Sequence, residues 1–210
     1  MPRNDPGPGS ASLAALLAFN YAPASYADPS WIAAMAPESQ RGNMPRDLFE
    51  SPRFAKRLSR LLVVQSGGGA TLPFSAAPQP LALESGATIL RVVDLCGAIV
   101  HAKDVRACIS GALRAALVDR IGSRGYEFVV KRVPFLRPAI QEAATGDLLR
   151  AVRESGAHCL GAWLATEGEA VERRVVLKLP KGLPRSPHHR EAGVDVLRMA
   201  VRAEGLRWTE

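Results

Sequence analysis

The chain has 210 residues, of which 47% are hydrophobic, 22% charged and 6% aromatic. This composition is typical of soluble globular proteins and excludes the disordered, collagen-like and disulfide-scaffold classes. Lysine and arginine together number 27 against 20 aspartates and glutamates, which gives a formal net charge of +7. The excess is spread along the chain without a run of five like charges, so the charge alone does not predict nucleic-acid binding.

The cysteines are Cys96, Cys108 and Cys159. They are too few and too scattered for a disulfide framework, and their odd number favours a reducing compartment. No stretch approaches the roughly 20 apolar residues that cross a bilayer. We therefore expect a soluble intracellular protein.

The first ten residues are polar and rich in proline and glycine, which predicts a disordered lead-in to a single helical domain over 11–210. The apolar stretch over 13–19 imitates the core of a secretory signal. Asn20 and Pro23 interrupt that stretch, so the pattern favours a short N-terminal helix that begins at Ser10 or Ser12.

The segment 21–50 places Tyr21, Tyr26 and Trp31 among four prolines. Aromatic side chains in such a loop-like segment either clamp it onto a core or form an exposed recognition surface. Both interpretations stay open from the sequence, and these three aromatics are one candidate partner-binding set.

A helical pattern begins at Pro52, a residue suited to the first turn of a helix. Apolar residues that recur at helical spacing predict one buried face, made by Phe54, Leu58, Leu61 and Leu62. The basic residues on the other faces, here called the basic strip, are Arg53, Lys56, Arg57 and Arg60. The basic strip is either a solvated face or a docking strip for an acidic partner. The stretch 66–80, rich in glycine and proline, predicts a loop and lacks the ending of a phosphate-binding P-loop.

The segment 86–101 is apolar almost all round, which predicts a helix in the core. Arg91 and Asp94 interrupt it at a spacing that allows an ion pair, and both need a partner if they are buried. Gly97 in this helix and Gly111 in the next one predict a close crossing of the two.

The following helix is expected to have Asp104 as its N-cap and to end before Gly122. Its apolar face contains Val105, Ile109, Leu113, Leu117 and Ile121. Segments 126–134 and 171–180 fit either a strand or a helix, whereas 147–164 and 191–203 have clear helical periodicity. The predicted fold class is mainly α, with a Pro-rich N-terminal segment and at most a small strand element.

No catalytic constellation has a recognisable local signature in this sequence. Cys96, His101 and Cys108, and the neighbours His158 and Cys159, do not match known zinc-site spacings. We therefore predict no catalytic residue, no metal and no cofactor. Two alternatives stay open: a small enzyme whose site assembles only in three dimensions, and a basic helical nucleic-acid-binding regulator.

Three blocks of sequence, in this order, resemble one family. They are FNYAPASYADPSWIAAM at 19–35, LRVVDLCGAIVHAKDVRACISG at 90–111 and GAHCLGAWLATEGEAVERRVVLKLP at 156–180. Together they resemble the SctK family of the YscK and PscK type, which are cytosolic sorting-platform proteins of bacterial type III secretion systems. Because the first block would belong to the mature fold, the resemblance also argues against a secretory signal.

The resemblance implies a helical, non-enzymatic adaptor at the cytosolic face of the inner membrane. Such adaptors link the cytoplasmic domain of the inner-membrane ring protein SctD to the SctQ pods. The implied partners are therefore an SctQ-type and an SctD-type protein, with no small-molecule substrate and no membrane insertion. The resemblance assigns no site residue.

Overall fold

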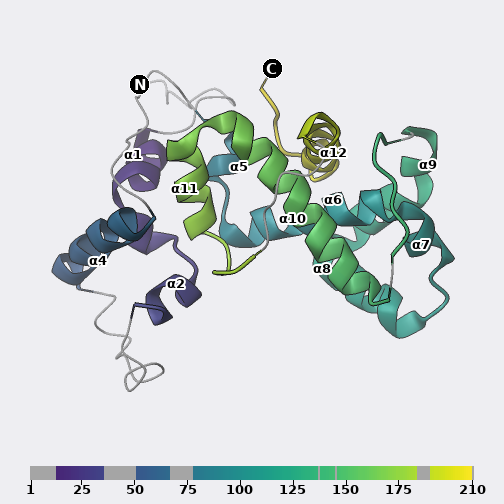
Figure 1. Cartoon of the computed structure of the whole chain (residues 1–210), viewed down its shortest axis with the longest axis horizontal. Helices are drawn as coiled ribbons and strands as arrows, with labels where there is room; N and C mark the ends of the chain where they lie inside the picture. The colour runs from purple at the N-terminus through teal and green to yellow at the C-terminus, as the bar shows by residue number, and fades with distance from the viewer. Residues whose placement is uncertain are drawn as a thin grey trace, which may run out of the picture. The chain divides into compact units, whose positions relative to one another are not determined.

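The computed structural model describes these parts of the chain: residues 13–35, 51–66, 78–136, 138–144, 146–183 and 190–209. Within these ranges the regular elements are helices, and there is no strand (Figure 1). The predicted mainly α fold class is therefore confirmed. The predicted lead-in over 1–10 and the central part of the predicted loop over 66–80 lie outside the described residues.

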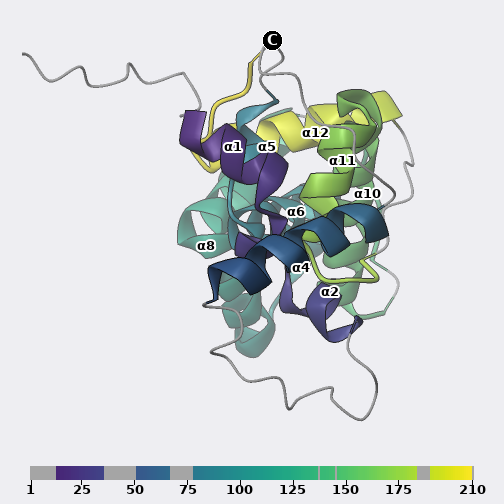
Figure 2. The same cartoon turned by 90° about the vertical axis from the view of Figure 1, so that its left-hand side faces the viewer.

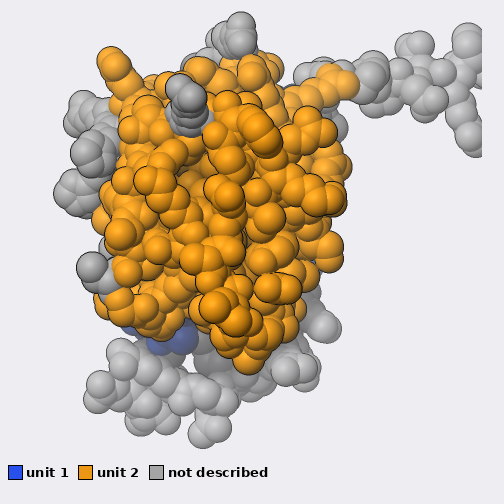
Figure 3. All heavy atoms as spheres, turned by 90° about the vertical axis from the view of Figure 1, so that its right-hand side faces the viewer, with its two compact units in different colours: residues 1–86, 169–181 blue, residues 87–168, 182–210 orange. Residues whose placement is uncertain are grey.

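Tertiary contacts divide the chain into two compact units. Unit 1 comprises residues 1–86 and 169–181, and unit 2 comprises residues 87–168 and 182–210. Figure 2 gives a clear view of the unit 1 helices, and Figure 3 shows unit 2 as orange spheres. The single helical domain predicted over 11–210 stays a prediction.

Unit 1 contains several short helices that begin at a proline. Pro23, Pro29, Pro52 and Pro80 each lie in the first turn of their helix, where the missing N–H would have no helical partner. The described elements of unit 1 are α1 (Leu13–Tyr21), η1 (Pro23–Ser25), α2 (Pro29–Ala33), α4 (Pro52–Gln65), α5 (Pro80–Leu83) and α11 (Glu169–Leu177).

The core of unit 1 forms where Leu58 and Leu62 of α4 meet Leu177 of α11, all three at most 5% exposed. The partly buried apolar side chains around this cluster are Ala24, Tyr26, Ala27, Trp31, Ile32, Met35 and Phe54. Leu61, which the sequence places on the buried face, is 47% exposed. The buried face of α4 is centred on Leu58, Ser59 and Leu62, so Leu61 lies at its edge.

Unit 2 is built around a helix whose second half is fully buried. Its described elements are α6 (Gly86–Val100, whose first residue belongs to unit 1), α7 (Ala102–Ala107), α8 (Gly111–Lys131), α9 (Val133–Leu136), α10 (Leu148–Glu167) and α12 (Arg190–Ala203). Every residue from Val92 to Val100 of α6 is buried, as its apolar sequence predicts. Helices α10 and α12 pack against each other, with Trp163, Leu197 and Val201 buried.

The close crossing predicted at Gly97 is present, but its partner is α10. A Cβ atom on Gly97 would lie 1.7 Å from the carbonyl oxygen of Val152. Gly111 has nothing within 4 Å of its Cβ position, so the prediction that it takes part in a close crossing is wrong. It lies at the first turn of α8, where it faces open space.

Asp94 is buried, and its partner is Arg153 of α10 rather than Arg91. The guanidinium of Arg153 donates to both carboxylate oxygens of Asp94, each at 2.6 Å. Arg91 is exposed one turn earlier on α6, and the ion pair that its spacing to Asp94 allows is not formed. A carboxylate without a partner is costly in a core, and α10 provides the guanidinium that pairs with Asp94.

The helix predicted after Asp104 is two helices. Asp104 lies in the first turn of α7, and its carboxylate accepts a hydrogen bond from the backbone N–H of Ala144 at 2.7 Å. The N-cap of α8 is Ser110, whose hydroxyl accepts from the N–H of Leu113. Ile109 lies in the break between the helices and is 94% exposed, which corrects its predicted inward position.

The two ambiguous segments are both helical. Residues 126–131 continue α8 beyond a kink at Gly122, whose φ of 72° is in the region that favours glycine. Segment 171–180 contributes most of α11. None of the described helices is long and apolar enough to cross a membrane.

Candidate functional site

A groove of about 420 Å³ lies on unit 1 and has two walls. One wall comes from the end of α1 and from η1, and the other comes from the first half of α4. The residues that line this groove, here called the unit 1 groove, are Tyr21, Ala22, Ala24, Ser25, Pro52, Ala55, Lys56, Leu58 and Ser59. A hydrogen bond from the N–H of Ala24 to the hydroxyl of Ser59, at 3.2 Å, joins the two walls.

The unit 1 groove brings together one residue from each candidate set. Tyr21, from the aromatic set, is 55% exposed. Lys56, from the basic strip, is exposed on the opposite wall. Residues 35 positions apart in the sequence therefore meet on one surface, which neither local pattern indicates.

The four members of the basic strip are all exposed on α4. No carboxylate of the described residues lies within ion-pairing distance of Arg53, Arg57 or Arg60, so their charge is not neutralised by the described part of this chain. Leu61 and Val64 are 47% and 70% exposed on the same helix. The surface of α4 thus combines positive charge with exposed apolar side chains.

Exposed apolar side chains also form a stripe along α1. Leu13, Leu17 and Tyr21 follow one another at intervals of four residues, so they share one helix face. They are 63%, 42% and 55% exposed. Contiguous apolar surface of this kind marks protein-interaction sites more often than scattered single residues do.

Tyr26 and Trp31 hold the segment 19–35 in place within unit 1. The hydroxyl of Tyr26 donates to the carbonyl of Phe19 at 2.8 Å, and its ring stacks on the ring of Phe19. The indole Nε1 of Trp31 donates to the carbonyl of Leu179 at 2.9 Å. Both side chains are partly buried, and they hold the segment that carries the exposed Tyr21.

Two buried cations that the sequence did not indicate, Arg174 of α11 and Lys178 directly after the end of α11, contact residues of the N-terminal helices. The Nζ of Lys178 donates to the carbonyls of Ala82 and Glu84, at 2.8 and 2.7 Å. The guanidinium of Arg174 donates to the carbonyl of Asn20 at 3.3 Å. Arg174 thus ties α11 to α1, and Lys178 ties the end of α11 to α5.

Burial lowers the pKa of both cations. It lowers the pKa of Lys178 to about 8, against a smaller opposite effect of Glu84. It also lowers the pKa of Arg174 and raises that of the neighbouring Tyr26. The Lys178 ammonium lies 5.0 Å from the ring centre of Phe19 and 5.1 Å from that of Tyr26, a favourable cation–π arrangement.

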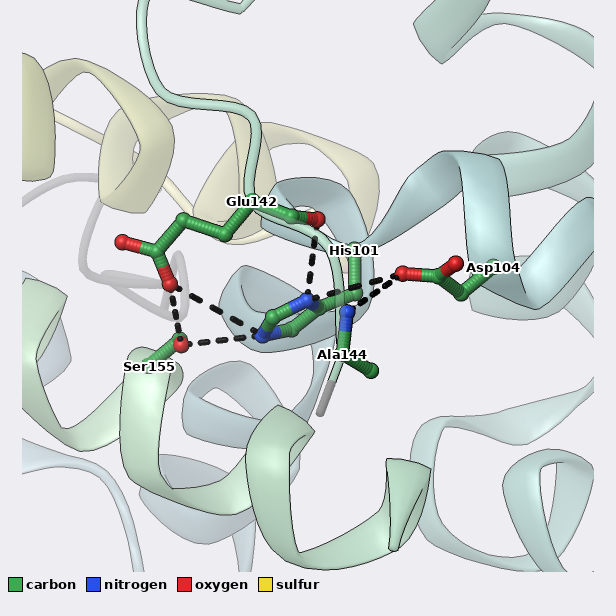
Figure 4. A network of polar contacts seen from close by, with 5 residues as sticks. All are labelled: His101, Asp104, Glu142, Ala144 and Ser155. Carbon is green, nitrogen blue, oxygen red and sulfur yellow. Dashed lines mark hydrogen bonds and ion pairs between the residues drawn. The ribbon is translucent and has the colours of Figure 1, made fainter. Parts of the chain in front are cut away.

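A polar network surrounds His101 in unit 2 (Figure 4). His101 is 2% exposed, with Nδ1 3.1 Å from the carbonyl oxygen of Glu142 and Nε2 3.0 Å from the hydroxyl of Ser155. That hydroxyl also lies 3.0 Å from the Glu142 carboxylate. In a hydrolytic triad the carboxylate accepts from the histidine Nδ1, whereas a backbone carbonyl occupies that place here.

The arrangement of this network fits a structural role. It fastens the segment 138–144 to the end of α6 and to α10, together with the contact of Asp104 to Ala144. Among the residues that the structure places, no three histidines, cysteines or acidic residues are grouped to hold a metal ion. Cys96, Cys108 and Cys159 are all buried, as expected for apolar filling residues.

A model of one protein family matches most of the chain. The matching family is described as "YOP proteins translocation protein K (YscK)", and the match covers residues 15–192. The chain belongs to the YscK family. The resemblance inferred from three blocks of sequence is confirmed, because all three blocks fall inside the matched range.

The nodulation protein NolU is a curated relative of this YscK family member. NolU of Rhizobium fredii and NolU of Sinorhizobium fredii (strain NBRC 101917 / NGR234) are each 34% identical to it over 95 residues. This match spans 44% of the chain and 43% of the length of NolU. No solved structure matches the chain significantly.

Membership of the YscK family makes the chain a type III secretion protein. The family is a component of the secretion apparatus. The matched range includes the unit 1 groove, the basic strip and the His101 network.

Proposed function

We propose that this chain is a non-enzymatic adaptor of the type III secretion sorting platform. In this role it links the cytoplasmic domain of an SctD-type inner-membrane ring protein to the SctQ-type pods, and it lies at the cytosolic face of the inner membrane. The observation that carries the proposal is the YscK family match over residues 15–192.

The surface of unit 1 supports a docking role. The unit 1 groove has Tyr21 on one wall and Lys56 on the other, and the rest of the basic strip continues along α4. Exposed aromatic and cationic residues are the side chains that most often dominate binding energy at protein interfaces. Tyr26 and Trp31 contribute by fixing the segment that presents Tyr21.

The positions of the ionisable groups with shifted pKa values favour binding over catalysis. Lys178, Arg174, Tyr26, Asp94 and Cys96 have shifted pKa values because they are buried, and none of them lines the unit 1 groove. An enzyme site would be expected to gather such groups in a concave pocket.

Binding measurements with purified components test the proposal. The full chain is mixed separately with an SctQ-type protein, with the cytoplasmic domain of an SctD-type protein and with duplex DNA, at low and high salt. We expect complexes with both proteins and none with DNA. A DNA complex with a steep salt dependence, without either protein complex, would instead establish the alternative of a nucleic-acid-binding regulator.

Charge reversal then locates the docking surface. Arg57→Glu with Arg60→Glu is expected to weaken one of the two protein complexes by about tenfold, which corresponds to ~1.4 kcal/mol. Tyr21→Ala is expected to weaken the same complex through lost apolar contact. Lys103→Glu with Arg106→Glu, an equal charge change at exposed positions of α7, serves as the control. Wild-type affinity of the α4 variant for both partners at low salt would show that the basic strip is only a solvated face.

A further inference from the structure

A second and larger groove, of about 760 Å³, lies on unit 2. It is bounded by the part of α8 after the Gly122 kink, by α9 and by the last turns of α12. The residues that line this unit 2 groove are Arg124, Glu127, Phe128, Lys131, Arg132, Leu136, Met199, Arg202 and Ala203.

The polar lining of the unit 2 groove is strongly cationic. It contains four basic residues and one carboxylate, an excess of three positive charges. Glu127 pairs with Lys131 at 2.6 Å. Across the described ranges no carboxylate lies within ion-pairing distance of Arg124 or Arg132, and both are exposed. These two guanidinium groups can therefore pair with charges from outside the chain.

The remaining lining of the unit 2 groove is apolar. Phe128, Leu136, Met199 and Ala203 contribute it, and Leu136 is 50% exposed. The neighbouring Phe135 is 85% exposed. Large apolar side chains left in water at one place mark interaction surfaces, and a methionine adapts its shape to different partners.

We propose that the unit 2 groove binds an acidic amphipathic helix of a protein partner. The apolar face of such a helix would cover Phe128, Leu136 and Met199, while its carboxylates would pair with Arg124 and Arg132. This is the usual way in which a helix docks into a groove. Duplex DNA would satisfy the cations but would leave the apolar lining in water, so the combination favours a helix.

The inference goes beyond the proposed function. It adds a docking surface on unit 2, and it does not depend on which apparatus protein binds unit 1. An adaptor needs at least two binding surfaces, and the unit 1 and unit 2 grooves are lined by different residues.

A model peptide tests the unit 2 groove directly. The probe is a fluorescent 20-residue helix with leucines at positions i, i+3, i+4 and i+7 and glutamates on its other face. Binding to the full-length chain is followed by fluorescence anisotropy. A second peptide with lysines in place of the glutamates has the same apolar face and the opposite charge. We expect the acidic peptide to bind and the basic one to bind at least about tenfold more weakly.

Two independent variants examine the two parts of the groove. Arg124→Glu with Arg132→Glu removes the cations, and Leu136→Ser removes exposed apolar surface. Each variant is expected to bind the acidic peptide about tenfold more weakly than the wild-type chain does. The control is Lys103→Glu with Arg106→Glu on α7, which should change the affinity less than about twofold because its charge change lies outside the groove.

Several results would overturn the inference. The first is an acidic peptide that does not bind to the wild-type chain. The second is an equal loss in the α7 control, which would show a general attraction between charges. The third is displacement of the peptide by duplex DNA, or an unchanged affinity in Leu136→Ser, because either would identify a plain anion-binding surface. Since Leu136→Ser and the charge variant are separate proteins, failure of one to fold leaves the other as the test.

Discussion

A Cβ atom on Gly156 would lie 3.1 Å from the backbone nitrogen of Gly97, so α10 and α6 meet backbone to backbone at these two glycines. The same Cβ would be 1.8 Å from the carbonyl oxygen of Val93. Real Cβ atoms do not approach backbone oxygens that closely, so neither position accepts a side chain without a shift of the helices. The buried pair of Asp94 and Arg153 connects the same two helices.

Gly97→Ala should therefore destabilise unit 2. The new methyl group would collide with the backbone of Val152, and separating the helices would cost about 1–3 kcal/mol or more of the free energy of unfolding. Denaturant unfolding measures the loss. Gly111→Ala is the matched control, because it faces open space and should leave stability unchanged or slightly raised. Equal stability of the two variants would contradict the close crossing.

Arg153→Met should destabilise the protein, because it leaves the buried carboxylate of Asp94 without its partner. At pH 7 the loss is expected to be about 3 kcal/mol, because the charge of Asp94 stays buried without its hydrogen-bonded partner and only the weaker effect of Arg120 remains. Arg150 lies one turn before Arg153 and forms an exposed ion pair with Glu154. The control variant Arg150→Met should therefore lower the free energy of unfolding by less than about 1 kcal/mol.

The loss in Arg153→Met should also depend on pH. Burial raises the pKa of Asp94 above its usual value, and Arg153 opposes that effect. Without Arg153, the folded state takes up a proton at a pH where the unfolded state has released it, so stability falls as pH rises through that window. The destabilisation measured at pH 4.5 should therefore be smaller than at pH 7, and an equal loss at both would argue against a buried Asp94 charge.

The wild-type chain should become more stable as the pH rises above 7, and Lys178→Met should abolish this increase. The folded protein releases the Lys178 proton near pH 8, whereas the unfolded chain holds it to about 10.5. Because the unfolded state binds more protons in this window, the free energy of unfolding of the wild-type chain should rise relative to the variant, by ~2 kcal/mol between pH 7 and pH 9.5. Chemical denaturation of both proteins from pH 7 to pH 9.5 measures the difference. A difference that does not change with pH would mean that Lys178 is not buried as a cation.

The thiol of Cys96 should be inert in the folded protein. It is fully buried, and burial raises the pKa of Cys96 well above that of a free thiol. A Cys108→Ser variant leaves Cys96 and Cys159, both at most 2% exposed. In that variant a thiol reagent at pH 8 should label neither cysteine until denaturant is added. Rapid labelling under native conditions would show that α6 and α10 separate readily.

The sequence by itself determined that the chain is helical and, for α4 and α6, most of the buried face. Helix periodicity arises from neighbours within two turns, so it predicted the all-round apolar helix ending at Val100 and the buried side of α4. It also predicted that the basic strip would be exposed, because those residues lie opposite an apolar stripe. The order and spacing of three blocks indicated the family, which the match over residues 15–192 confirms.

Tertiary structure alone decided which residues meet. Asp94 pairs with a residue 59 positions away, and His101 binds the segment around Glu142. Lys178 is buried against carbonyls of residues more than 90 positions earlier. The unit 2 groove likewise joins α8 to α12 across some 70 residues of chain. Local patterns carry no information on such contacts, because each depends on how helices far apart in the sequence pack together.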